Sequence, residues 1–217
     1  MVDFSRPLLD WYELHKRDLP WRREITPYRV WVSEIMLQQT RVEAARGYFE
    51  RFMAAFPDVE TLAAADEDTV LKLWEGLGYY ARARNLHRCA KLIVSDCGGT
   101  FPADAAALKK LPGIGDYTAG AIASIAFGQR ESAVDGNVCR VLTRLTACGE
   151  PVDETLKARY RRELREICPA ERSGEFTSAL MELGETVCVP GAPACGRCPL
   201  AGLCRARAAG TPYKNTL

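Results

Sequence analysis

The segment Leu111-Pro112-Gly113-Ile114-Gly115-Asp116-Tyr117-Thr118-Ala119-Gly120 sets the architecture of this 217-residue chain. A stretch with helical periodicity, 105–111, runs into a tight Pro-Gly-x-Gly turn, and a second helical stretch, 117–127, starts at once. Glycine at positions 113 and 115 permits a positive φ and lets a phosphate approach the backbone closely. Because the first amides of a helix attract anions, the segment predicts two helices joined by a turn that can hold an anion.

Two interpretations of this segment are open. A helix–hairpin–helix grips the DNA backbone without reading its sequence, and Gly113 and Gly115 would then be the phosphate contacts. A plain hairpin of two helices would have the same pattern and no ligand.

Helical periodicity recurs on both sides of the hairpin, whereas two-residue alternation is nearly absent. Trp31, Ile35, Gln38 and Val42 are spaced to share one helix face, and proline and glycine separate the periodic stretches. We therefore expect an all-α fold of about ten helices with short loops. Further apolar stripes lie at 49–56, 70–77 and 138–145.

Composition limits the function only loosely. Hydrophobic residues make up 47% of the chain and the net charge is +1, so disorder is not expected and bulk charge does not indicate nucleic acid. No apolar run approaches the roughly 18 residues of a membrane span, and no signal peptide is recognisable. We expect a cytoplasmic protein.

Four cysteines crowd the end of the sequence with the spacing C-x6-C-x2-C-x5-C: Cys188, Cys195, Cys198 and Cys204. Structural zinc sites usually have two C-x2-C pairs, and only one is present. Disulfides need an oxidising compartment. Four thiolates from one short segment fit a [4Fe–4S] cluster. The five remaining cysteines are expected to be free thiols, mostly packed.

Glu34 is an acid within the apolar run 30–37. No basic residue stands three or four positions away, where a helical ion pair would form. A partly buried carboxyl has a raised pKa and can act as a general acid, although a structural glutamate bonded to backbone is the alternative. Gln38, Gln39 and Thr40 follow as a polar group that could read base edges or fill the gap left by a flipped base.

Asp135 follows the hairpin by about twenty residues, in Ser132-Ala133-Val134-Asp135-Gly136-Asn137-Val138. Alone it would be read as the N-cap of the next helix. Behind a hairpin that holds phosphates, the same carboxylate can face a deoxyribose.

The segment Trp74-Glu75-Gly76-Leu77-Gly78-Tyr79-Tyr80 is a glycine-rich turn that ends in adjacent tyrosines and is followed by two arginines. This arrangement suits an aromatic wedge beside phosphate contacts. The alternative is an aromatic plug in the core with surface arginines.

Taken together, these motifs resemble the helix–hairpin–helix DNA glycosylase superfamily that includes endonuclease III, and within it the adenine DNA glycosylase, or MutY, branch. The resemblance covers essentially the whole chain. It implies two helical lobes, 23–129 and 1–22 plus 130–217, with a DNA cleft between them. It also implies a monomer that binds double-stranded DNA, carries a [4Fe–4S] cluster on the four cysteines and excises adenine mispaired with 8-oxoguanine or guanine.

The resemblance assigns roles to individual residues. It makes Glu34 the general acid, Asp135 the stabiliser of the oxocarbenium ion and Asn137 its support. Tyr117 stands where bifunctional endonuclease III carries lysine, which implies a monofunctional enzyme. Tyr79 matches the intercalating residue. The implied base pocket comprises Arg17, Leu19, Trp21, Arg22, Leu37, Gln39 and Thr40.

The chain departs from the family pattern in three places. Thr177 and Ser178 replace an Asn and a Glu or Gln, the second of which helps to recognise adenine in the family. The loop 189–194 between the first two cluster cysteines has no charge. The family's C-terminal 8-oxoguanine-recognition domain would follow near Gly210, and we expect it to be missing.

Two alternative functions remain open. A glycosylase that removes thymine from G·T mispairs would share this chemistry, with Gln38-Gln39 favouring adenine. A catalytically silent iron–sulfur DNA-binding module would need neither Glu34 nor Asp135.

Overall fold

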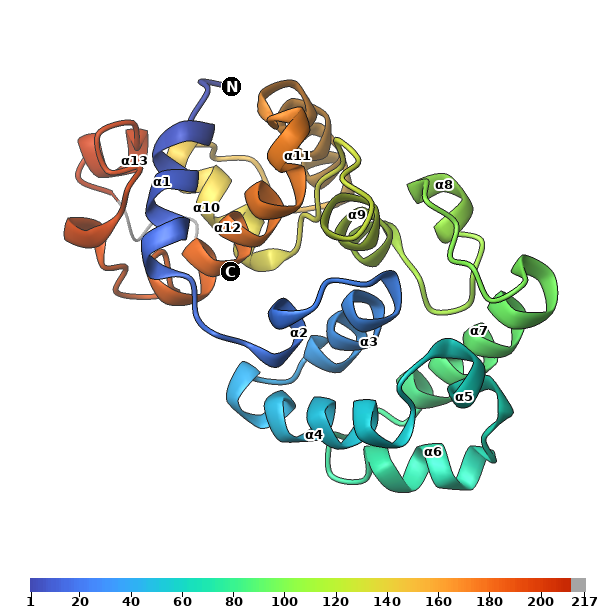
Figure 1. Ribbon diagram of the computed structural model, residues 1–217. Coiled ribbons are helices and arrows are strands. Elements are labelled where there is room, and N and C mark those ends of the chain that lie inside the picture. The colour runs from blue at the N-terminus through green and yellow to red at the C-terminus, as the bar shows by residue number, and fades with distance from the viewer. Residues whose placement is uncertain (212–217) are drawn as a thin grey trace. The chain divides into compact units, whose positions relative to one another are not determined.

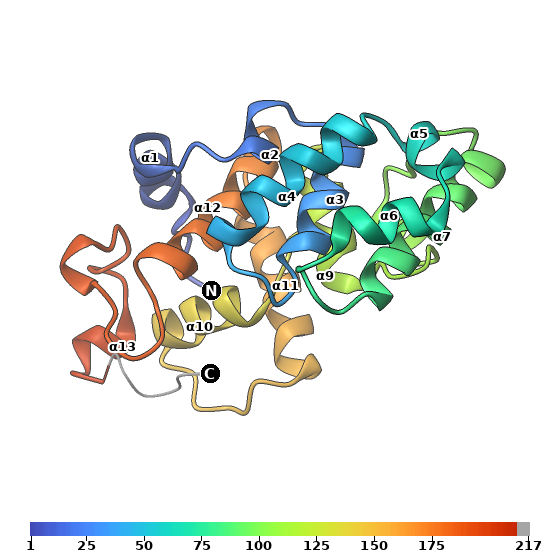
Figure 2. The same cartoon turned by 90° about the horizontal axis from the view of Figure 1, so that it is seen from below.

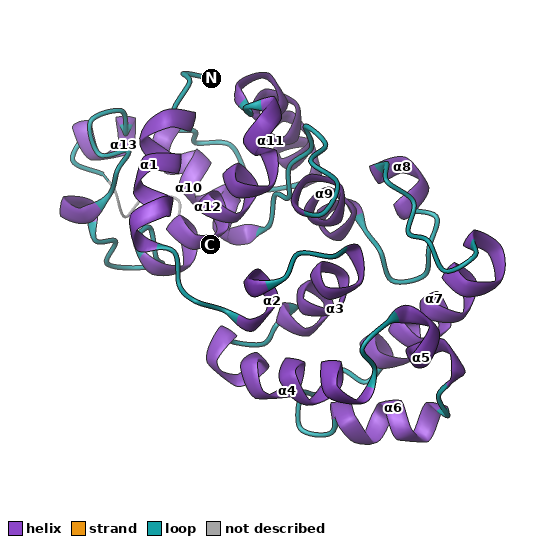
Figure 3. Cartoon of the chain, viewed as in Figure 1, coloured by secondary structure: helices purple, strands orange, loops and turns teal. Residues whose placement is uncertain are grey.

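The computed structural model describes residues 1–211, which form thirteen α-helices and two short 3-10 helices. No strand occurs in this part of the chain, as Figure 3 shows. The prediction of an all-α fold is therefore confirmed. Within the same residues, no helix is both long and apolar enough to cross a membrane.

Contacts divide the chain into two compact units. One unit is continuous, Asp18–Phe127, and the other joins Met1–Arg17 to Gly128–Leu217. The chain passes from one unit to the other after residues 17 and 127. The sequence predicted these boundaries a few residues later, after residues 22 and 129.

The continuous unit is arranged around one helix, α3 (Pro27–Leu37), which packs against α2, α4, α7 and α9 (Figure 1). Its core contains the fully buried Trp31, Phe52 and Trp74, with the rings of Phe52 and Trp74 edge to face at 6.2 Å. The other helices are α2 (Pro20–Arg23), α4 (Val42–Ala55), α5 (Val59–Ala64), α6 (Glu67–Trp74), α7 (Ala81–Cys97), α8 (Ala105–Leu108) and α9 (Asp116–Ile125).

The ends of α3 have different causes. At the start, the Thr26 side chain accepts a hydrogen bond from the Arg29 amide at 3.2 Å and Pro27 occupies the first turn, both of which favour helix initiation. At the other end, the expectation that the helix continues through Gln38 to Val42 was wrong. The helix stops at Leu37 because Gln39 adopts a left-handed φ of 58°, and a new helix starts at Val42.

The second unit packs α12 (Ser173–Thr186) against both α1 (Ser5–His15) and α10 (Gly136–Thr146), and Figure 2 shows α10 beside α12. Its core includes the buried Leu8, Leu142, Tyr160, Phe176 and Leu183. α10 also contacts α11 (Glu154–Ile167) and α13 (Arg205–Ala208). The 3-10 helices are Ala170–Arg172 and Cys195–Arg197.

Candidate functional site

The hairpin predicted from the sequence is formed by α8, a turn and α9. Gly113 has a φ of +77°, and a Cβ there would come within 3.0 Å of the Asn85 Cβ, so the turn needs glycine for both conformation and space. Gly115 is the N-cap of α9, and no side chain caps this end. Gly113 and Gly115 are exposed, and Tyr117 is half-buried in the first turn of α9. An exposed helix start, where the first amides point along the helix axis toward solvent, can accept a phosphate.

Glu34 lies in α3 and is 6% exposed. Most of α3 is buried on all sides, and its Val32, Ile35 and Met36 belong to the core of this unit. A carboxyl in such surroundings is held away from water, as proton donors in acid-assisted catalysis usually are.

The polar residues after Glu34 lie in the turn between α3 and α4. Gln38 and Thr40 are half-buried, and Gln39 is exposed. Tyr79 is 64% exposed, unusual for an aromatic side chain of this size, so the wedge interpretation agrees with the structure better than the core-plug alternative.

The remaining base-pocket candidates differ in their surroundings. Leu19 and Trp21 are buried in the core of the continuous unit, where the Trp21 ring meets the Phe49 ring edge to face. Leu37 packs against that core, and Arg22 is half-buried in α2. In the other unit, the Arg17 guanidinium binds Glu182 at 2.7 and 3.0 Å and also contacts Glu185, so Arg17 ties the end of α1 to α12.

Asp135 caps α10 in the second unit. Its Oδ1 accepts a hydrogen bond from the Val138 amide at 2.7 Å, and its Oδ2 accepts one from Asn137 Nδ2 at 3.2 Å. Asn137 Oδ1 in turn accepts from Arg140 at 2.8 Å. Burial raises the pKa of the Asp135 carboxyl, and the hydrogen bonds from Val138 and Asn137 oppose that rise. The N-cap interpretation is thus correct, and it leaves the carboxylate oriented by two donors.

The two departures from the family pattern, Thr177 and Ser178, lie in the first half of α12. Thr177 is buried, and its hydroxyl has no hydrogen-bond partner among the described residues. Ser178 is half-buried.

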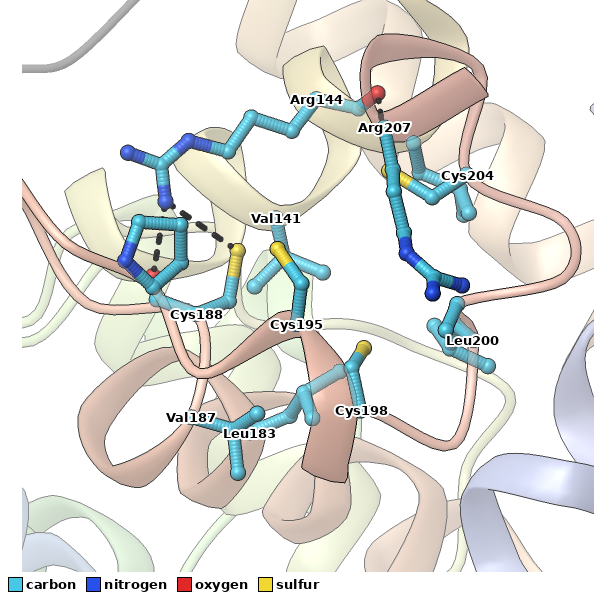
Figure 4. Close-up of a pocket in the computed structure, with 13 residues that line it drawn as sticks. Val141, Arg144, Leu183, Val187, Cys188, Cys195, Cys198, Leu200, Cys204 and Arg207 are labelled. Atoms are coloured by element: carbon cyan, nitrogen blue, oxygen red, sulfur yellow. Dashed lines mark hydrogen bonds between the residues drawn. The ribbon is translucent and has the colours of Figure 1, made fainter. Parts of the chain in front are cut away.

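The four clustered cysteines line one cavity of about 440 Å³, part of which is open to solvent. Figure 4 shows Cys188, Cys195, Cys198 and Cys204 around this space. Burial is the main reason why the pKa of the Cys198 thiol rises to about 11, so a metal centre would have to displace its proton. Within residues 1–211, no group of three or more His, Cys, Asp or Glu side chains was found that could hold a single metal ion.

A buried cation stands beside these cysteines. Arg144 of α10 is 2% exposed and contacts Cys188 Sγ at 3.4 Å, the Cys188 carbonyl at 3.3 Å and the Val189 carbonyl at 2.9 Å (Figure 4). Its Nε and Nη2 have no hydrogen-bond partner among the described residues. A desolvated guanidinium that meets no carboxylate in these contacts fits an anionic group in the cavity.

Sequence reasoning missed the buried arginines. Arg140 is 3% exposed and donates to the Cys188 carbonyl and the Gly184 carbonyl, both at 2.8 Å, and Arg144 lies one turn further along α10. Both arginines stand among the apolar residues of the α10 stripe, Val141 and Leu145, and this placement is the signal that could have identified them.

Comparisons with known proteins agree with this geometry. Residues 32–170 match the family described as HhH-GPD superfamily base excision DNA repair protein. The chain is 47% identical to the adenine DNA glycosylase of Homo sapiens, over 94% of this chain and 39% of that protein. It is 42% identical to the adenine DNA glycosylase of Mycolicibacterium smegmatis, over 94% of this chain and 70% of that protein.

Solved structures give the same fold. A thermostable thymine-DNA glycosylase superposes with a TM-score of 0.86 at 26% identity, covering 95% of both chains. An endonuclease III–DNA complex superposes with a TM-score of 0.77 at 24% identity, covering 94% of both, which shows the fold alone. The chain spans about two fifths of the human relative's length. By its family match and its likeness to the mycobacterial protein, this chain belongs to the HhH-GPD superfamily of base excision DNA repair proteins, within the adenine DNA glycosylases.

Proposed function

We propose that the protein is a monofunctional DNA glycosylase that removes adenine mispaired with 8-oxoguanine or guanine. One observation carries the proposal. Glu34 and Asp135 are both withdrawn from water, in a chain that is 42–47% identical to adenine DNA glycosylases over 94% of its length. A catalytically silent DNA-binding module would gain nothing from Glu34, whose burial costs stability, whereas Asp135 would still cap α10.

DNA binding would begin at the hairpin. The exposed start of α9 suits a backbone phosphate, and Gly113 and Gly115 allow close approach. A base in the duplex is out of reach of buried groups, so the target nucleotide must leave the stack, at a cost of a few kcal/mol. Gln38, Gln39 and Thr40 would contact bases at the lesion, and Tyr79 would enter the duplex.

The chemistry would use the two carboxyls in different protonation states. Glu34 in its apolar surroundings donates a proton to the adenine ring, which makes the base a better leaving group. Positive charge then develops on the sugar, and ionised Asp135, oriented by the Val138 amide and Asn137, stabilises it until water attacks. Asn137 takes part by fixing the carboxylate's orientation.

The four cysteines would hold a [4Fe–4S] cluster. The support is that their side chains line one cavity and that, within residues 1–211, two nitrogens of the buried Arg144 guanidinium beside Cys188 have no hydrogen-bond partner. Such a cluster, bound by four thiolates, keeps no open coordination position and would supply structural rigidity and an electron-transfer capacity. Iron and acid-labile sulfide analysis of anaerobically purified protein tests this. One zinc and no iron would exclude the cluster.

The decisive experiment for the activity is a single-turnover panel on duplexes with A·8-oxoG, A·G, T·G and U·G pairs. We expect excision of adenine from the first two. Release of thymine from T·G faster than release of adenine would identify a thymine glycosylase. No turnover on any duplex would favour the non-catalytic DNA-binding module.

Two substitutions test the roles of the carboxyls in that panel. Glu34→Gln and Asp135→Asn should each lower the excision rate by at least the ~10²–10⁴-fold typical of general acid catalysis, with duplex binding retained. Asp153→Asn is the matched control, because Asp153 caps α11 in the same unit with its Oδ1 2.8 Å from the Leu156 amide. A near-wild-type rate in either test variant would remove that residue from the mechanism.

A further inference from the structure

Arg82, in the first turn of α7, holds two separate loops of the continuous unit. Among the described residues it makes six hydrogen bonds, two to the last turn of α3 and four to these loops, and all six acceptors are neutral. Nη1 donates to the carbonyls of Ile35 at 2.9 Å and Met36 at 3.1 Å and to that of Gln38. Nη2 donates to Thr40 Oγ1 at 3.4 Å and to the carbonyls of Leu77 at 3.1 Å and Gly78 at 3.2 Å.

Both loops contain strained backbone. Gln39 has a φ of 58° and Tyr79 a φ of 48°, and only one other non-glycine residue in the described chain has a positive φ. Left-handed backbone costs about 1–2 kcal/mol for a residue with a Cβ, and it persists where surrounding contacts impose it. Two of the carbonyls that Arg82 binds, at residues 38 and 78, come directly before the two strained residues.

The guanidinium also lies over aromatic rings. Its central carbon is 5.3 Å from the centroid of Trp74, which is fully buried, and 5.6 Å from that of Tyr79, which is 64% exposed. The Trp74 contact anchors the cation in the core, whereas the Tyr79 contact orients a ring that faces solvent. One side chain therefore connects the end of α3, the core and the exposed tyrosine.

We propose that Arg82 is a positioning residue that joins Gln38–Thr40 and Tyr79 into one DNA-reading surface. Insertion of Tyr79 into the duplex and contact of Gln38, Gln39 and Thr40 with the bases at the lesion then depend on each other. The inference rests on the proposed function for its DNA substrate, and on the six hydrogen bonds alone for the coupling of the two loops.

The role requires arginine. A guanidinium has five donors in a planar fork, so Nη1 can bind the end of α3 and the loop after it while Nη2 binds Thr40 in that loop and the other loop at 77–78. A lysine ammonium is a single point with three donors and cannot span both sets of carbonyls. Arg82→Lys should therefore retain the positive charge and lose most of the coupling.

The first test uses no DNA. Hydrogen exchange is compared for wild type, Arg82→Lys, Arg82→Gln and Arg88→Gln, the last an exposed arginine further along α7 that serves as the control. Both Arg82 variants should speed exchange in segments 38–41 and 77–80 together while the rest of the unit stays protected. Faster exchange in one segment alone, or in neither, would overturn the coupling.

The second test measures coupling on DNA. Arg82→Gln and Tyr79→Ala should each lower the preference for mispaired over matched duplex by about tenfold, and the double variant should lose little more than either single one. The fluorescence of 2-aminopurine placed beside the mispair rises when that base unstacks. The same variants should show a smaller rise than wild type. Additive losses in the double variant would overturn the proposal. If wild type shows no preference for a mispair, the proposed function fails, and the exchange experiment still decides whether Arg82 couples the loops.

Discussion

At the scale of single residues, Asp135 combines two requirements that conflict. As the N-cap of α10 it satisfies the Val138 amide, which stabilises the helix. As a carboxylate it is poorly hydrated, and burial raises its pKa. The hydrogen bonds from Val138 and Asn137 favour the ionised form and limit the rise. Burial of this carboxylate therefore has a cost in folding stability, which the two hydrogen bonds reduce.

That cost should be measurable as a function of pH. A carboxyl whose folded pKa is raised contributes stability that is full below its unfolded pKa and is lost as pH rises through the folded pKa. Asp135→Asn removes the titration and keeps a good N-cap, so the variant should be more stable than wild type at pH 7. The difference should shrink as the pH falls toward the ordinary aspartate range. Denaturant unfolding between pH 7 and pH 4 measures it, and a variant less stable at pH 7 would contradict the expectation.

Arg144 presents the opposite case, a buried cation. Its contacts with Cys188 Sγ and two carbonyls leave Nε and Nη2 without partners in the part of the chain that the structure describes, so the bound cluster should supply the compensating negative charge. We expect Arg144→Gln to lose iron several times faster than wild type under a chelator, as followed by the cluster's visible absorbance. Arg205→Gln is the control, because Arg205 is an exposed arginine that directly follows Cys204. Equal rates of iron loss in wild type and Arg144→Gln would show that the cation does not retain the cluster.

At the scale of helices and turns, periodicity predicted most of the fold. Most residues of the stripes at 31–35, 49–56, 70–77 and 138–145 lie on helices that bury those faces, because spacing dictates which side chains share a helix face. Phe56 and Leu77 are buried as expected but lie beyond the ends of α4 and α6. The end of α3 could not be predicted. The sequence 38–41 has no glycine or proline to mark a turn, and the carbonyls there are bound by Arg82, 44 residues away from Gln38. The buried arginines were missed because a sequence shows which residues are charged and does not show which atoms surround them.

The crossing of α10 and α12 depends on one glycine. A Cβ on Gly184 would lie 3.0 Å from the Asn137 Cβ and 3.1 Å from its carbonyl oxygen, and that carbonyl belongs to the backbone of α10. Helix propensity favours alanine by about 1 kcal/mol, but overpacking typically costs about 1–3 kcal/mol. Gly184→Ala should therefore destabilise the protein and lower the excision rate by displacing Asn137 from Asp135. Gly149→Ala, where the new methyl group would meet nothing within 4 Å, is the control for both measurements.

At the scale of the whole molecule, the candidate residues are shared by two units. The hairpin, Glu34, Arg82 and Tyr79 belong to Asp18–Phe127, whereas Asp135, Asn137 and the cysteines belong to the unit that includes both described ends of the chain. The N-terminal segment is attached to the later part of the chain by contacts such as Arg17–Glu182, 165 residues apart. The sequence motifs identified the residues in each unit, and only the structure showed that α1 packs on α12, because no periodic pattern records which distant helices meet.

The outcome for the DNA strand depends on the hairpin residue Tyr117. Strand cleavage by β-elimination needs an amine that forms a Schiff base with the sugar, and a phenol cannot do so. Lys109, before the hairpin turn, is ion-paired with Asp116 at 2.7 Å and is the amine to be tested as an alternative nucleophile. We expect an intact abasic site that breaks only after alkali. Tyr117→Lys should gain strand cleavage and be trapped on DNA by borohydride, while Lys109→Ala should cleave no less than wild type. Stoichiometric cleavage by wild type without alkali would contradict the monofunctional mechanism, and its loss in Lys109→Ala would name that lysine as the nucleophile.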